Sequence, residues 1–294
     1  MKRLVILGST GMLGSEVTRV AKESGIVIIE ISRSGEVSFD ATTHSFEMLA
    51  NNLGLNENDW VVNCIGWIPQ KASGDIAIDE EDAYLLNCSL PEKISKSKKE
   101  LGFNWIQIGT DCVFSGKEGN YSESSEYDPI DLYGKSKAEG EMVSDGDIRI
   151  RCSVVGRDEK SSSGLYEWFK SQEPEKPING FMNHYWNGVT TTAFAKLAIG
   201  LFNSGQNKPI RHHWVPRDKV SKYELLQIFQ KELGSKTGIV PHQNSADINR
   251  ILSTSNTHLN ENLWDLAGYD QIPSIEELCQ EFISIDKKLG LDRD

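Results

Sequence analysis

The chain has 294 residues, which corresponds to one large domain or to two smaller ones that share a core. Hydrophobic residues make up 38% of it, a share that excludes a disordered chain. The formal net charge is −12, which argues against nucleic acid and anionic membranes as partners. No apolar run approaches the roughly 18 residues that a membrane-spanning helix needs.

The chain contains five cysteines, an odd number, at wide spacing. This pattern predicts free thiols in a reducing compartment, and therefore a cytoplasmic protein without a disulfide scaffold or a cysteine metal site. Three cysteines lie in or beside apolar runs and are predicted to be buried: Cys64, Cys112 and Cys152.

Short apolar runs alternate with helical patterns through the first half of the chain. Leu4–Leu7 is too short for the core of a signal peptide, and we interpret it as a strand. A helical pattern over Gly11–Ser24 and an apolar run at Ile26–Ile31 complete a strand–helix–strand unit. The alternation continues with helices at Ser45–Leu53, about Asp79–Leu101 and Tyr133–Val143, and with strands at Trp60–Ile65, Trp105–Ile108 and Ile148–Val155. Pro91 is expected to restart or kink the long helix. The pattern predicts an α/β fold with a Rossmann-like, doubly wound parallel sheet.

After Gly156 the regular alternation weakens. The expected elements are, in order, a polar stretch at Arg157–Ser163, a helix at Leu165–Ser171, a loop from Pro174 to Gly180, a helix at Thr191–Phe202, a strand at Pro209–Val215 and a helix at Ser221–Leu233. We expect a sheet domain of residues 1–155 and about 189–215. Residues of about 156–188 and 216–294 are expected to form a smaller, discontinuous lobe.

A glycine-rich segment, Gly8–Gly14, follows the first strand and opens the first helix. Its glycines Gly8, Gly11 and Gly14 permit a tight turn, a close approach of a diphosphate and close packing of the helix, respectively. The backbone N–H groups of such a helix start attract anions. We therefore predict a dinucleotide site contacted by Gly8, Thr10, Gly11, Met12 and Leu13.

The end of the second strand indicates which dinucleotide binds. The strand ends in Ser32 and Arg33, which suit the 2′-phosphate of NADP(H) better than a ribose hydroxyl. Glu30 is acidic and only two residues earlier, so NAD(H) stays open as the alternative. Asp40 and Ala41, after the expected third strand, are predicted to contact the adenine.

Tyr133 and Lys137 form a Y-x-x-x-K pattern, which puts both side chains on one face of a helix. A phenol near a cation is a plausible acid or base for a carbonyl–alcohol pair, and we expect Lys137 to lower the pKa of Tyr133. Thr110 and Asp111 follow a strand at the sheet edge where ligands bind. We expect Thr110 to hydrogen-bond the reacting oxygen and Asp111 to orient or protonate it.

Together these motifs resemble the extended short-chain dehydrogenase/reductases, in particular the dTDP-4-dehydrorhamnose reductase group. The likeness rests on Gly8–Gly14, Thr110–Gly116, Tyr121–Glu123, Asp128–Pro129 and Tyr133–Glu141. The resemblance implies Thr110, Tyr133 and Lys137 as the catalytic trio, a nucleotide-sugar lobe, and a cofactor-lining loop at Asn63–Gly66 that includes Cys64, Ile65 and Gly66. Cys112 stands where the group carries an aromatic residue.

Four residues are predicted to bind the substrate: Asp111, Cys112, Trp186 and Asn187. For Trp186 and Asn187, ligand contact and a structural role are equally supported. Trp168 and Phe169 are expected in the core because of their helical spacing. His212 and His213 have no third ligand at metal spacing, so no metal site is expected, and Asn87 is expected to tie neighbouring loops together.

The leading hypothesis is an NADP(H)-dependent reductase of a 4-keto nucleotide-diphospho-sugar, with a homodimer expected from the family. Dehydration is disfavoured because Cys112 replaces the elimination base of the dehydratases. A nucleotide-sugar epimerase needs the same trio and stays open. So does a non-catalytic regulatory subunit, because eukaryotic relatives of the group regulate methionine adenosyltransferase.

Overall fold

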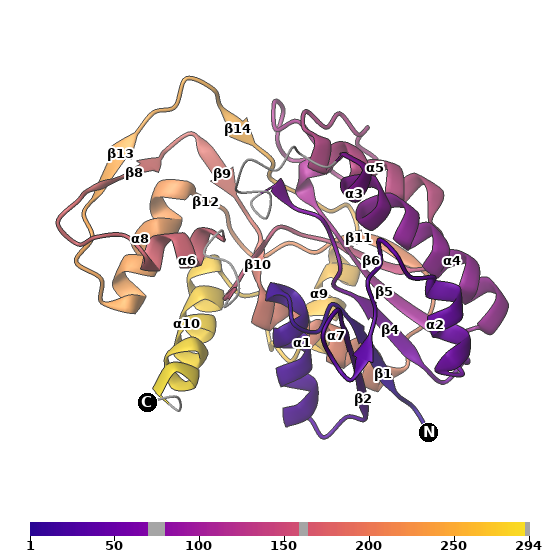
Figure 1. The fold of residues 1–294 in the computed structure, drawn as a ribbon. Coiled ribbons are helices and arrows are strands. Elements are labelled where there is room, and N and C mark those ends of the chain that lie inside the picture. The colour runs from indigo at the N-terminus through magenta and orange to yellow at the C-terminus, as the bar shows by residue number, and fades with distance from the viewer. Residues whose placement is uncertain (70–79, 159–163, 292–294) are drawn as a thin grey trace.

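The computed structural model describes residues 1–69, 80–158 and 164–291. Its centre is a seven-stranded parallel sheet with the strand order β11-β6-β5-β4-β1-β2-β3 (Figure 1). The strands are β1 (Leu4–Leu7), β2 (Ile28–Ser32), β3 (Val37–Ser38), β4 (Trp60–Asn63), β5 (Asn104–Gly109), β6 (Ile148–Arg151) and β11 (Ile210–His213). The predicted doubly wound parallel sheet is confirmed, and the strand order reverses between β1 and β4, where open α/β sheets bind ligands.

Helices cover both faces of this sheet. One face packs on α1 (Met12–Glu23), α7 (Thr191–Ser204) and α9 (Thr257–Leu266), and the other on α2 (Phe46–Asn52) and α4 (Leu90–Leu101). Strand β1 shows why its sequence is apolar throughout, since Leu4 and Ile6 belong to the first core and Val5 and Leu7 to the second. The helix α5 (Leu132–Val143) lies beside α4.

Two predicted elements are divided in the structure. The expected strand Ile148–Val155 ends at Arg151, and β7 (Val154–Val155) leaves the sheet to pair with β10 (Val189–Thr190). The long helical stretch is divided into α3 (Glu80–Tyr84), a π-helical turn (Leu85–Ser89) and α4, and its predicted start at Asp79 lies outside the described residues. Pro91 stands in the first turn of α4, directly after the π-helical turn.

A second group of elements packs around its own core. It comprises α6 (Leu165–Lys170), α8 (Lys222–Leu233) and α10 (Ile275–Leu291) with the short strands β8 (Ile178–Phe181), β9 (His184–Trp186), β12 (Val220–Ser221), β13 (Ile239–His242) and β14 (Ile248–Asn249). Phe169 is in this core as predicted, whereas Trp168 is 37% exposed, so its core assignment was wrong. A helix of six residues does not reveal from spacing which face is buried.

Other sequence expectations have simple outcomes. Residues 159–163 of the expected polar stretch lie outside the described residues. All five cysteines are free, but Cys64 and Cys112 are only partly buried because both lie at the sheet edge and not within a strand. In the part of the chain that the structure describes, no helix is long and apolar enough to cross a membrane.

Candidate active site

The glycine-rich turn needs glycine at two of its positions. Gly8 has a φ of +78°, which L side chains rarely adopt, and a Cβ on Gly14 would lie 2.1 Å from the Gly8 carbonyl oxygen. Gly11 begins α1 without a side-chain cap, and the first turn of the helix holds no acidic residue. The N–H groups at this end of α1 are therefore available to an anion.

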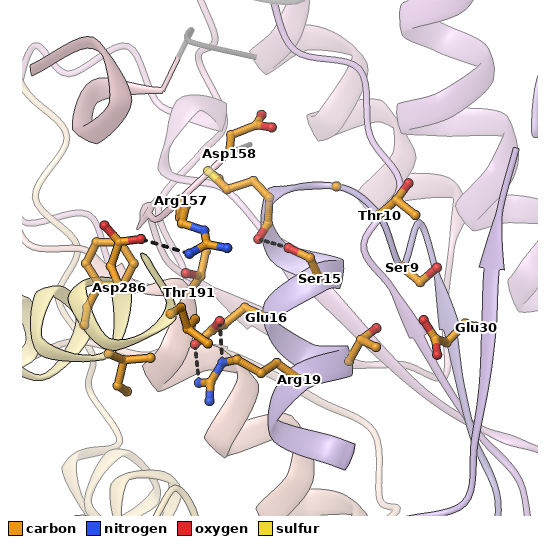
Figure 2. Close-up of a pocket in the computed structure, with 16 residues that line it drawn as sticks. Ser9, Thr10, Ser15, Glu16, Arg19, Glu30, Arg157, Asp158, Thr191 and Asp286 are labelled. Carbon is orange, nitrogen blue, oxygen red and sulfur yellow. Dashed lines mark hydrogen bonds and ion pairs between the residues drawn. The ribbon is translucent and has the colours of Figure 1, made fainter. Parts of the chain in front are cut away.

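A pocket of about 420 Å³ lies in front of this turn (Figure 2). The residues of the turn and of α1 line one side, and residues of α10 with Arg157 line the other. Arg157 donates to Asp286 across 3.2 Å, which links the turn's surroundings to the C-terminal helix. The pocket includes Thr10, Gly11 and Met12, and the predicted catalytic trio lies outside it.

At the end of β2, Ser32 is buried and Arg33 is exposed. Glu30, the residue that kept NAD(H) open, forms an ion pair of 2.5 Å with Lys22 of α1. Asp40 accepts hydrogen bonds from the Thr42 backbone N–H and hydroxyl, which lower the pKa of the Asp40 carboxyl. Contact of Ser32, Arg33, Asp40 and Ala41 with a dinucleotide stays a prediction.

The loop after β4 links the glycine-rich turn to the catalytic helix. A Cβ on Gly8 would lie 3.0 Å from the Ile65 side chain and 3.2 Å from the Cys64 carbonyl carbon. A Cβ on Gly66 would lie 3.0 Å from the Lys137 Nζ atom. One short loop therefore touches both the turn and the ammonium group, and residues far apart in the sequence meet at the sheet edge.

Tyr133 and Thr110 face each other across the ends of α5 and β5. The Thr110 hydroxyl lowers the pKa of the phenol, but burial has the larger effect and raises it. Lys137 lies with its Nζ atom 6.0 Å from the centre of the Tyr133 ring. The net pKa of Tyr133 is therefore raised, because desolvation outweighs the effect of the neighbouring groups, and the lowering expected from Lys137 stays a prediction.

Lys137 is buried, and none of the described residues accepts a hydrogen bond from its ammonium group. Burial lowers the pKa of Lys137 to about 8, and Arg149 adds to this effect while Glu141 opposes it. Asn87 lies beside it in the π-helical turn, where its amide bonds the Trp67 backbone and the Ser136 hydroxyl. The structural role expected for Asn87 is confirmed.

A buried ion pair lies behind the trio. Arg151 donates to both carboxylate oxygens of Glu141, at 3.1 and 2.5 Å, and to the Thr110 carbonyl oxygen at 2.8 Å. Arg151 and Glu141 are both less than a tenth exposed. Since Glu141 is one helical turn beyond Lys137, this pair ties α5 to the strand end that carries Thr110.

The same pair is held from two further sides. Arg151 donates to the Tyr127 hydroxyl at 2.6 Å and from Nε to the His213 Nε2 atom at 3.0 Å. His213 Nδ1 lies 3.0 Å from the carbonyl oxygens of Tyr121 and Ser253, so it carries the proton and the ring is neutral. Both ring nitrogens of His213 are therefore occupied by hydrogen bonds within the protein. Among the described residues no cluster could hold a metal ion.

Two cations from the second group of elements act on the Thr110–Cys112 turn, Arg250 by a hydrogen bond and Lys222 by its charge. Sequence reasoning missed both. Arg250 donates to the Phe114 carbonyl oxygen at 3.0 Å and to the Cys112 Sγ atom at 3.5 Å. Burial raises the pKa of Asp111, while Arg250 and Lys222 oppose this. Both cations are more than 100 residues beyond Asp111 in the sequence, so no local sequence pattern could predict that they lie near it.

Trp186 and Asn187 have clear structural roles. The Asn187 side chain donates to the Leu252 carbonyl oxygen at 2.7 Å and accepts from the Leu252 N–H at 3.0 Å. Trp186 is buried, and the Lys222 Nζ atom lies 5.5 Å from its ring. These contacts account for both side chains, and their predicted contact with a substrate stays a prediction.

Comparison with known proteins gives a family match over almost the whole chain. The model of the RmlD substrate binding domain matches residues 1–287. The spore coat polysaccharide biosynthesis protein SpsK of Bacillus subtilis is 27% identical over 249 residues, 82% of each chain. Methionine adenosyltransferase 2 subunit beta of Xenopus tropicalis is 28% identical over 241 residues, 76% of this chain and 70% of the relative.

Among solved structures, dTDP-4-dehydrorhamnose reductase from Bacillus anthracis in complex with NADP has a TM-score of 0.78. The alignment covers 97% of this chain and 99% of that structure at 18% identity, a likeness that concerns the fold. Together with the family match, it confirms the resemblance that the motifs predicted.

Proposed function

The chain belongs to the RmlD substrate binding domain family, and on that premise we propose that it is an oxidoreductase that uses NADP(H) to reduce the 4-keto group of a nucleotide-diphospho-sugar. The observation that carries the proposal is the loop at Cys64–Gly66, which contacts Gly8 on one side and the Lys137 ammonium on the other. This juxtaposition brings the glycine-rich turn and the Tyr133–Lys137 pair to the same edge of the sheet, which supports one site formed by both.

The described residues fit a bound dinucleotide. The N–H groups at the start of α1 are uncapped, and the Lys137 ammonium has no acceptor among the described residues, so it can hold the ribose hydroxyls. Arg33 is exposed at the end of β2, while Glu30 is paired with Lys22, which favours NADP(H) over NAD(H). When bound, NADPH supplies the hydride.

The trio supplies the proton chemistry. Because burial raises the pKa of Tyr133, its phenol stays protonated near neutral pH, which is the form that a carbonyl reduction requires. The Thr110 hydroxyl faces this phenol and can position the carbonyl oxygen. Tyr133 then donates its proton to that oxygen as the alcohol forms, and the Lys137 ammonium stabilises the phenolate that remains.

We also propose a division of labour between the two groups of elements. Residues 1–155 and about 189–215 hold the dinucleotide, and residues of about 156–188 and 216–294 hold the substrate. Lys222 and Arg250 support this division, because both extend from the second group to the turn that carries Asp111.

The test is NADPH consumption against a panel of 4-keto-6-deoxy sugars linked to dTDP, UDP and GDP. We expect turnover with at least one member. Tyr133→Phe is expected to abolish turnover while its NADPH affinity stays near that of the wild type. Tyr84→Phe, at a half-buried tyrosine on α3, is the matched control and should retain full activity. Equal rates for Tyr133→Phe and the wild type would reject Tyr133 as the acid.

A regulatory subunit is the second candidate, because the identity to methionine adenosyltransferase 2 subunit beta extends over 76% of the chain. NADPH binding without turnover on the whole panel, together with co-purification of an adenosyltransferase, would favour it. Purified protein that retains NAD through gel filtration would instead favour the epimerase alternative.

A further inference from the structure

Lys222 belongs to the second group of elements, and its charge acts on Asp111 at the candidate active site. Lys222 is the first residue of α8, whose start is fixed by a reciprocal cap between Ser221 and Glu224. The ammonium lies 5.5 Å from the centre of the Trp186 ring. Trp186 is itself only 5% exposed, so it forms a fixed platform beneath the lysine.

The charges that act on Lys222 identify its neighbours. Burial lowers the pKa of Lys222, Asp111 and Cys112 oppose this, and Arg250 adds to it. Asp111 and Cys112 directly follow Thr110, so the ammonium lies within electrostatic range of the turn that carries Thr110. The second cation at this turn, Arg250, extends from the same group of elements.

The two cations differ in how the protein uses them. Arg250 donates to Phe114 and to Cys112 and lies 3.9 Å from the Asp131 carboxylate. By contrast, no described residue accepts a hydrogen bond from the Lys222 ammonium or forms an ion pair with it. The Asp111 carboxylate accepts instead from Thr110 and Cys112. The N–H groups of the Lys222 ammonium are therefore available to a ligand.

We propose that Lys222 binds the diphosphate of the nucleotide-sugar substrate. A desolvated ammonium without a protein acceptor is stabilised by an anionic oxygen, and the diphosphate is the anion that every substrate of the proposed class carries next to its sugar ring. Lys222 thus fixes the distance between the diphosphate and the Thr110–Tyr133 pair, which sets the carbon presented for reduction.

The inference rests on the proposed function, but its test does not require turnover. The dissociation constants of dTDP and UDP are measured by calorimetry for the wild type, Lys222→Met and Lys222→Arg. Lys222→Met is expected to weaken nucleoside diphosphate binding about 10- to 100-fold, and Lys222→Arg to restore most of it. NADPH affinity should stay unchanged in all three proteins.

Lys219→Met is the matched control. Lys219 is exposed, and its ammonium lies 5.7 Å from the Tyr185 ring, so it shares the cation–aromatic contact but not the position at the catalytic turn. Unchanged dTDP and UDP affinity in Lys222→Met would overturn the inference even if the enzyme is an active reductase. Weakened NADPH binding with unchanged dTDP binding would also overturn it, because the anion would then belong to the cofactor.

Discussion

The Arg151–Glu141 pair gives a prediction that separates stability from catalysis. Arg151→Met removes the donor to the Thr110 carbonyl oxygen and the cation that hydrogen-bonds the buried Glu141 carboxylate, which keeps only Arg149 at 3.7 Å. Replacing both residues in Arg151→Met/Glu141→Met removes the stranded charge as well. We therefore expect the double variant to recover stability but not activity, because the hydrogen bond from Arg151 to the Thr110 carbonyl oxygen is still missing.

The size of the effect follows from burial. Both side chains are less than a tenth exposed, and breaking such a pair from one side costs about 3–5 kcal/mol. Unfolding a chain of 294 residues changes the entropy by roughly 0.6 kcal/mol/K, so the Tm of Arg151→Met falls by about 5–8 °C. The double variant should regain more than half of this, and both should lose about 10- to 100-fold in kcat.

The assays are thermal unfolding followed by calorimetry, turnover of the keto sugar, and NADPH affinity. Arg149→Met is the control, because Arg149 is equally buried and bonds Asp147, Ser144 and the Glu141 backbone carbonyl without a hydrogen bond to Thr110. It should lose stability with a much smaller loss of kcat. Full activity in the stable double variant would refute the positioning role of Arg151.

Three further predictions concern other parts of the site. Arg33→Ala should weaken NADPH binding about 10- to 100-fold and leave NADH binding unchanged, as measured by fluorescence titration. Gly66→Ala would push a methyl group toward Lys137 Nζ and should lower kcat about 10- to 100-fold in the same turnover assay. Burial and the charge of Arg151 lower the pKa of His213 to about 4, below its unfolded value of about 6.5. The unfolded state therefore binds the proton first, and stability should fall as pH decreases from 6.5 toward 4.

Each of these has its contradicting outcome. Equal losses of NADPH and NADH affinity in Arg33→Ala would place the guanidinium away from the 2′-phosphate. Wild-type kcat in Gly66→Ala would separate the loop from the ammonium. For His213, the comparison is the urea midpoint at pH 7 and pH 5 in the wild type and His213→Gln, and an identical pH dependence would remove this residue as its source.

Local sequence patterns were enough for the sheet and for the geometry of the glycine-rich turn. Leu4–Leu7 is apolar at every position because its side chains alternate between two cores, and this signal does not depend on distant residues. The glycine at position 8 was likewise predictable, since its turn requires a positive φ. Such features are encoded within a few residues.

Features created by tertiary contact were not predictable. The π-helical turn at Leu85–Ser89 is held by Asn87, which bonds a loop 20 residues earlier and a helix 49 residues later. The raised pKa of Tyr133 comes from burial, which the Y-x-x-x-K spacing does not report. The sequence could have identified Glu141 as part of the site, because it follows Lys137 by four positions and so lies on the same face of the helix.

The most direct measurement is deuterium transfer from NADPH labelled at its transferable hydrogen to the sugar, followed by mass spectrometry of the product. If Tyr133, Lys137 and the glycine-rich turn converge on one reacting carbonyl, the wild type should deliver one deuterium to the carbon of the new alcohol. Tyr133→Phe should bind labelled NADPH equally well and deliver none. An unlabelled product from the wild type, or equal labelling by both proteins, would contradict the account.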